Sequence, residues 1–200
     1  MPRWALATGG SAAALATALA LASLALLEAE AEPLWLMALS VGVVVAWIAW
    51  QDFADFTIPD AAVLALGVLG AAFRLPQGAS AGEPFGETLL LMGLDLTLSG
   101  GLLLLVREIY FRRRGHDGMG FGDVKLAAAG GVLAGTSGFA WALLAASLLG
   151  ITLALMRGGK ASRLAHLGSA DKLPFGAILA PALWVVWLTG HSPHWSALAP

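Results

Sequence analysis

Apolar residues are gathered into long stretches that short polar segments separate. Most of these stretches hold about twenty residues, which is enough for an α-helix to cross the roughly 30 Å hydrocarbon layer of a membrane. The expected helices cover residues 4–27, 33–51, 58–75, 88–106, two parts of 126–156, and 173–190. The pattern therefore predicts an all-α fold, a polytopic transmembrane bundle of about six to seven helices.

Residues 126–156 contain 31 uncharged positions in a row. One straight helix of that length would exceed the thickness of the hydrocarbon layer. The segment Gly135-Thr-Ser-Gly138 lies within it and is a turn signal. We therefore expect two helices that reverse direction there. Gly131 and Gly135 also form a Gly-x-x-x-Gly pair, which allows helices to approach closely in lipid.

The first stretch, residues 4–27, has a second interpretation as a cleaved signal peptide. It holds 24 uncharged residues. The apolar region of a signal peptide is shorter, at about 7 to 15 residues. The length therefore favours a membrane helix.

The composition agrees with a membrane protein. Of the 200 residues, 58% are hydrophobic and 12% are charged, and the mean hydropathy is +0.80. A soluble domain has about 45 to 50% apolar and about 25% charged residues, so a lipid bilayer is the expected surrounding. The net charge of −2 argues against a nucleic-acid partner. The lack of cysteine excludes disulfides, iron–sulfur clusters and a thiol nucleophile. We expect residues 1–200 to form one integral membrane domain.

The basic residues test this arrangement, because lysine and arginine tend to remain on the cytoplasmic side of a membrane. With seven segments and the N-terminus inside, ten of the eleven basic residues lie on that side and only Arg74 lies on the other. A single crossing at 126–156 would separate the two main basic loops, so it is rejected. The ten residues are Arg3, Arg107, Arg112, Arg113, Arg114, Lys125, Arg157, Lys160, Arg163 and Lys172.

Two short acidic motifs adjoin the apolar stretches on this cytoplasmic face. The first is DFADFTIPD, residues 52–60, and the second is GMGFGDVKL, residues 118–126. Charged groups beside a membrane are costly, so each is a candidate for function. The alternative for Asp123 is a helix N-cap. The alternative for Asp52 is a solvated residue at the interface.

Two carboxyl groups brought together in a partly dry site supply an acid and a base at once. Like charges at close range cannot both ionise, so one group keeps its proton. The ionised group can take a proton from a water that attacks a peptide carbonyl, while the protonated group hydrogen-bonds the developing oxyanion. Such a pair hydrolyses a peptide bond with neither a metal nor a nucleophilic side chain.

The motifs resemble those of the type IV prepilin peptidases, which are membrane aspartyl proteases of the GxGD type. That family carries an aspartate before an Ile/Leu-Pro-Asp/Asn motif, then Gly-x-Gly-Asp followed by Val/Phe-Lys-Leu, and later Pro-Phe-Gly. All three motifs occur here in the same order. The matching residues are Asp52, Pro59, Asp60, Gly120, Gly122, Asp123, Lys125, Leu126, Pro174, Phe175 and Gly176.

The resemblance implies a prepilin-peptidase-like core over about residues 34–190 and an aspartic endopeptidase of the bacterial inner membrane. Such an enzyme removes the basic leader from prepilin or pseudopilin precursors at the cytoplasmic face, in type IV pilus assembly, Flp pilus assembly or protein secretion. Asp52 and Asp123 would be the catalytic pair, with no metal and no cofactor.

Other residues near the motifs have two interpretations. The acidic side chains of Asp55, Asp60 and Asp117 could attract a basic leader or could simply be solvated. Lys125 could pair with an aspartate or extend its ammonium to the interface.

The match to the family has one gap. Larger members carry a cysteine-rich region after the first helix and also methylate the new N-terminus. This chain has EAEAEP at residues 28–33 and no cysteine. We therefore expect peptidase activity alone, as in the short forms of Flp-type pilus systems. Asp117 stands where larger members place a glutamate before Gly-Met-Gly.

Two other functions stay open. A small transporter, or a proton or cation channel, would use Asp52, Asp95 and Asp123 as a path of carboxylates spread through the membrane depth. Asp95 lies inside residues 88–106, where a charge should face a partner or a cavity. A catalytically silent assembly protein would keep the fold and bind pilins.

Overall fold

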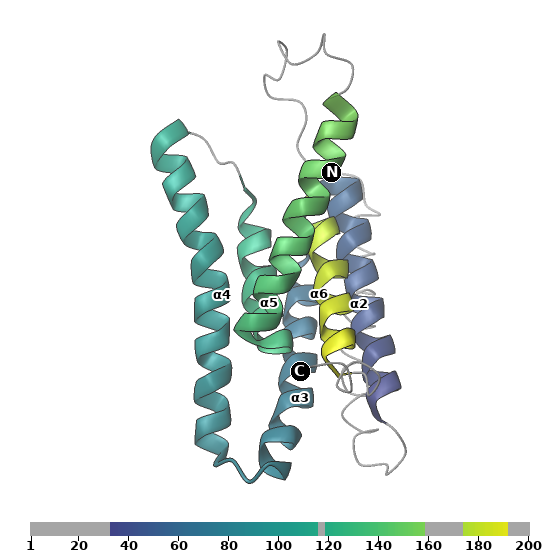
Figure 1. Cartoon of the computed structure of the whole chain (residues 1–200), viewed down its shortest axis with the longest axis vertical. Coiled ribbons are helices and arrows are strands. Elements are labelled where there is room, and N and C mark those ends of the chain that lie inside the picture. Colours follow the sequence, from purple (N-terminus) through teal and green to yellow (C-terminus); the bar gives the residue numbers. More distant parts are fainter. Residues whose placement is uncertain (1–32, 116–118, 159–173, 192–200) are drawn as a thin grey trace, which may run out of the picture.

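The computed structural model describes residues 33–115, 119–158 and 174–191, and every regular element there is a helix (Figure 1). The helices are α2 (Pro33–Asp55), α3 (Asp60–Ser80), α4 (Phe85–Arg114), α5 (Phe121–Gly158) and α6 (Gly176–His191). The all-α fold expected from the apolar stretches is confirmed. The expected helix at residues 4–27 lies outside the described residues.

Helix α5 is two helices joined at a break. The backbone at Gly135 has φ 72° and ψ 167°, which is not helical. In Figure 1 the first half of α5 runs downward from Phe121 and the second half runs back up. The reversal expected at Gly135–Gly138 is confirmed, and its physical cause is the freedom of glycine to adopt a positive φ.

The helices continue past the apolar stretches from which they were predicted. Helix α2 continues through Asp52, and α5 begins at Phe121, several residues earlier than its uncharged stretch. Helix α3 begins at Asp60, so Pro59 lies just before the first turn rather than within it. Consequently Asp52 lies near the end of α2 and Asp123 lies in the first turn of α5.

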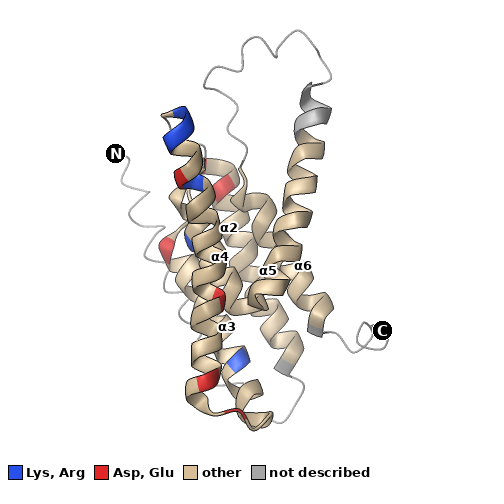
Figure 2. Cartoon of the chain, turned by 60° about the vertical axis from the view of Figure 1, so that its left-hand side comes forward, with Lys and Arg blue, Asp and Glu red and all other residues tan. Residues whose placement is uncertain are grey.

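The outer surface of the bundle is apolar. Helices α2, α3, α4 and α5 are long and apolar enough to cross a membrane, and α6 is a shorter apolar helix. Figure 2 shows long stretches of these helices without charged residues. Many large apolar side chains are exposed, above all on α4. Lipid is the natural cover for such a surface, and the chain is a multi-pass membrane protein.

The first half of α5 lies at the centre of the bundle, where it packs against α3, α4 and α6. Glycines allow the close approach. A Cβ at Gly70 of α3 would lie 2.8 Å from Leu133 Cα, and a Cβ at Gly131 would overlap the backbone of Asp95 and the side chain of Ser99. Of the predicted Gly-x-x-x-Gly pair, Gly131 therefore makes the helix contact, whereas Gly135 makes the break.

Candidate active site

Asp52 is a buried carboxyl that links α2 to α6. Its side chain belongs to the last turns of α2, and the residue is only 5% exposed. Its Oδ2 accepts a hydrogen bond of 2.7 Å from the backbone N–H of Ala177, and the N–H of Gly176 is also a donor to this carboxyl. The free N–H groups of a helix N-terminus favour a carboxylate. Asp52 therefore caps α6 and is not the solvated residue of the alternative interpretation.

Asp123 is the second buried carboxyl, and it is 8% exposed. It lies in the first turn of α5, three residues after Gly120, rather than at the N-cap position of the alternative interpretation. From there its side chain contributes to capping the start of the helix, as in a capping box. The backbone N–H of Gly120 is a donor to this carboxyl. Its Oδ1, however, has no hydrogen-bond partner among the residues that the structure describes. A buried polar atom without a protein partner calls for an explanation, and a role in proton transfer supplies one.

The three sequence motifs meet at the side chain of Ile58. A Cβ at Gly122 would lie 3.0 Å from Ile58 Cβ. A Cβ at Gly176 would lie 2.6 Å from Ile58 Cδ1 and 3.1 Å from Asp52 Oδ2. Only glycine fits these two positions without displacing Ile58. The packing thus explains why the second and third motifs carry a glycine here, a contact that the sequence did not reveal.

The two carboxyls act on each other. Asp52 lies close enough to Asp123 for its charge to repel that of Asp123. Burial weakens the solvation that would otherwise support two negative charges, which favours a state in which one of the two carboxyls keeps its proton. Within the described ranges no group of three or more His, Asp or Glu side chains is placed to hold a metal. The arrangement suits acid–base chemistry on a bound substrate.

Charged side chains at the rim of this site are paired. Lys125 Nζ lies 2.7 Å from Asp60 Oδ1, so Lys125 pairs with an aspartate. Asp55 is exposed and accepts a hydrogen bond of 3.0 Å from Gln51. Asp117 lies outside the described residues. Among the residues that the structure describes, Asp60 therefore has a cationic partner and Asp55 has none.

Arg107 of α4 is a contact of the site that the motifs did not reveal. Its Nε donates to the carbonyl of Met119 at 3.3 Å, and its guanidinium lies 5.8 Å from the centre of the Phe121 ring. Lys125 Nζ also lies 5.3 Å from that centre. Both cations lie within reach of the ring's π-system. Through Arg107, the residues just before Asp123 are joined to α4.

Asp95 is not part of the pair. It lies on α4 beside the break in α5, where it pairs with Arg74 of α3 at 2.6 Å. The helix between Asp123 and the break at Gly135 is about 18 Å long, so Asp95 lies far along the bundle from the pair. The expectation that Asp95 faces a partner or a cavity is met, since a cavity of about 500 Å³ lies beside both residues.

The fold and the site define a multi-pass membrane protein with two buried carboxyls from separate helices at one end of its bundle. Residues 39–155 match the model of the type IV leader peptidase family, and the chain belongs to that family. A prepilin leader peptidase/N-methyltransferase from Aeromonas salmonicida strain A449 is 32% identical over 162 residues, which cover 78% of this chain and 50% of the relative.

A second protein with the same description, from Aeromonas salmonicida, shows the same identity and coverage. The chain thus spans about half the length of the curated relatives that it matches. No solved structure matches it.

Proposed function

We propose that this chain is an aspartic endopeptidase of the bacterial inner membrane that removes the basic leader from type IV pilin-like precursors. The observation that carries the proposal is the burial of Asp52 and Asp123 together, with Asp123 Oδ1 lacking a protein partner. Family membership and the related prepilin leader peptidases support the substrate class. The distribution of basic residues supports a cytoplasmic active site.

The mechanism follows from the hydrogen bonds of the pair. Asp52 accepts hydrogen bonds from two backbone N–H groups at the start of α6, whereas Asp123 Oδ1 has no protein partner among the described residues, so Asp52 is the better placed of the two to carry the negative charge. Asp52 takes a proton from a water, whose oxygen then bonds to the scissile carbonyl carbon. Asp123 donates its proton toward the developing oxyanion. When the C–N bond breaks, Asp52 gives the proton that it took from the water to the leaving nitrogen, and Asp123 takes a proton back from the former oxyanion. The products are a new carboxyl end and a new amino end, and both aspartates return to their starting states.

The channel alternative has less support. A carboxylate path would need Asp95 to be available to an ion, yet its oxygens are bound to Arg74 and Thr136. The first half of α5, about 18 Å of helix, separates it from Asp123.

Cleavage by single variants tests the proposal. Asp52→Asn and Asp123→Asn keep the size of the side chain but remove its proton chemistry. Each should lower the rate of leader removal by about 10² to 10⁴-fold, since general acid and base catalysis contribute that much. Purified protein in liposomes is incubated with a prepilin, and the new N-terminus is measured by mass spectrometry. The matched control is Glu87→Gln, which alters an exposed carboxyl in the first turn of α4, at the opposite end of the bundle. Normal cleavage by either site variant, in correctly inserted protein, would refute the mechanism.

A further inference from the structure

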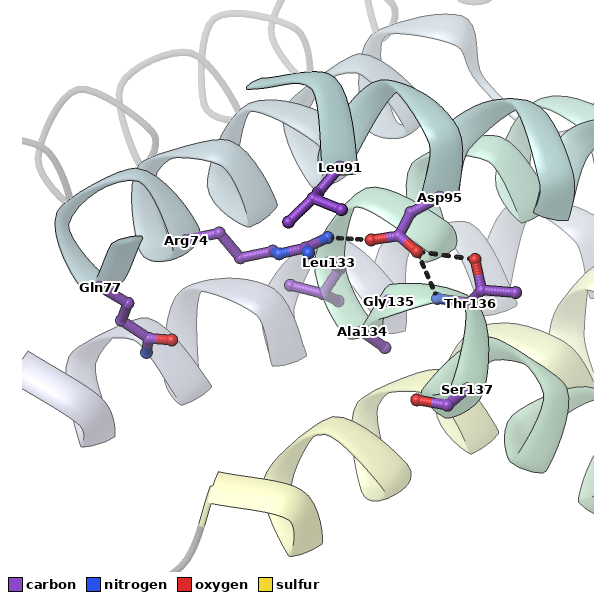
Figure 3. Close-up of a pocket in the computed structure, with 9 residues that line it drawn as sticks. All are labelled: Arg74, Gln77, Leu91, Asp95, Leu133, Ala134, Gly135, Thr136 and Ser137. Carbon is purple, nitrogen blue, oxygen red and sulfur yellow. Dashed lines mark hydrogen bonds and ion pairs between the residues drawn. The ribbon is translucent and has the colours of Figure 1, made fainter. Parts of the chain in front are cut away.

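The ion pair between Arg74 and Asp95 lies at the break in α5, and Figure 3 shows it beside Thr136 at the edge of the cavity. The two side chains come from α3 and α4, so three helices meet there. Arg74 is 24% and Asp95 is 17% exposed at the side chain. Because the two charges neutralise each other, the cavity offers a ligand little net charge. The pair therefore calls for an explanation within the fold.

The break leaves two helix ends inside the bundle. The first half of α5 ends with unpaired carbonyl groups, and the second half begins with unpaired N–H groups. The break lies about 18 Å of helix away from Asp123. That distance places it within the hydrocarbon layer, where irregular backbone is tolerated only if protein groups satisfy it.

The ion pair forms hydrogen bonds with the backbone at both helix ends, and each charge is opposite in sign to the helix end that it contacts. Asp95 Oδ1 accepts hydrogen bonds from the backbone N–H of Thr136 at 2.9 Å and from its hydroxyl at 2.6 Å. Arg74 donates to the carbonyl of Val132 at 3.3 Å. An anion thus meets the positive N-terminus of the second half, and a cation meets the negative C-terminus of the first half.

We propose that Arg74 and Asp95 are positioning residues that clamp the break in α5 and thereby set the axial position of Asp123 relative to Asp52. The first half of α5 is a short, stiff rod with Asp123 at one end and the clamped break at the other. Tight contacts at Gly131 hold the clamped end against α4. A shift of the break by one residue relative to Arg74 and Asp95 would move the first half of α5 along its axis by about 1.5 Å. The catalytic consequence rests on the proposed function, whereas the placement of α5 does not.

The kinetic test separates positioning from substrate binding. Asp95→Asn should lower kcat by about 10 to 100-fold, because a misplacement of about 1 Å has that cost, while KM changes little. Arg74→Lys, which keeps the charge, should retain more activity than Arg74→Gln. Thr136→Val should lower kcat too. Thr152→Val is its matched control, because among the described residues the Thr152 hydroxyl bonds to Leu148 of its own helix and to no other helix.

A distance measurement tests the placement of α5 without any catalysis. The chain has no cysteine, so spin labels can be attached to cysteines introduced at chosen pairs of exposed positions. The pair Phe121 and Ala79 reports α5 against α3, and the pair Ala54 and Ala79 reports α2 against α3 as a control. Asp95→Asn should shift or broaden the first distance distribution and leave the second unchanged. Thr136→Val is measured in parallel, so the test does not depend on insertion of one variant.

Each outcome decides the proposal. A fall in kcat together with a changed distance from Phe121 to Ala79 supports it. An unchanged distance overturns it, whatever happens to the rate, and a changed distance with normal kcat overturns the catalytic role of the clamp. If the native chain cleaves no prepilin, the proposed function fails, while the distance measurement still tests the clamp.

Discussion

At the scale of the residue, contacts between motifs explain why particular side chains are required. Ile58 separates Gly122 from Gly176, and Gly176 in turn lies against the carboxyl of Asp52. A helix begins at Gly176 with its N–H groups directed at that carboxyl. The small size of Gly176 is therefore a condition for placing Asp52 at the start of α6.

Gly176→Ala tests this condition. The added methyl group would meet Ile58 Cδ1 at 2.6 Å and Asp52 Oδ2 at 3.1 Å. Overpacking of this kind destabilises a folded protein by about 1 to 3 kcal/mol. We expect a lower unfolding temperature and a fall in kcat, because Asp52 must move. The measurements are thermal unfolding in detergent and prepilin cleavage.

Gly93→Ala is the matched control for Gly176→Ala. Nothing lies within 4 Å of a Cβ at Gly93, which is on α4. Its stability should be equal or slightly higher, since alanine favours helix. Equal behaviour of the two variants would show that the contact at Gly176 is not tight.

At the scale of the element, α5 determines how the bundle is built. Its first half is the central helix, and its second half returns beside the bundle after the break at Gly135. The torsions of Gly135 belong to a region that is essentially restricted to glycine. The hydrogen bond from Thr136 to Asp95 and the bond from Arg74 to Val132 then stabilise the two ends.

Gly135→Ala tests the importance of these torsions. Forcing alanine into this backbone conformation costs about 1 to 3 kcal/mol. We expect a corresponding loss of stability, measured by thermal unfolding, even though little crowds a Cβ at this position, where the nearest atom is Asp95 Oδ2 at 3.8 Å. Gly101→Ala of α4, which meets nothing within 4 Å, serves as the control. A native-like stability of Gly135→Ala would mean that the break does not depend on glycine.

At the scale of the whole molecule, the helices place both catalytic candidates at one end of the bundle. The ends of α2 and the starts of α3, α5 and α6 meet there, and the basic end of α4 lies on the same side. Exposed Ala54 belongs to this end, and exposed Ala79 belongs to the opposite end. The orientation of the bundle in the membrane therefore decides which compartment the site faces.

Thiol labelling tests the proposed orientation. Single cysteines replace Ala54 or Ala79 in this cysteine-free chain, and intact cells are treated with a reagent that does not cross the membrane. The cysteine at position 79 should be labelled, and the one at position 54 should be protected, because basic residues favour the cytoplasmic side. Permeabilised cells provide the control for reactivity. The reverse pattern would place the site outside and rule out cytoplasmic leader removal.

The sequence by itself determined the helical class and the turn within residues 126–156. These features depend on local quantities, namely the length of apolar stretches against the thickness of a bilayer and the backbone freedom of glycine. Only the tertiary structure decided which groups the buried aspartates bond to. Asp52 accepts a hydrogen bond from Ala177, which is 125 residues away in the sequence, and Asp95 accepts one from Thr136, which is 41 residues away. Such pairs depend on the axial register of packed helices, which no local pattern encodes because small shifts of one helix leave its apolar face unchanged.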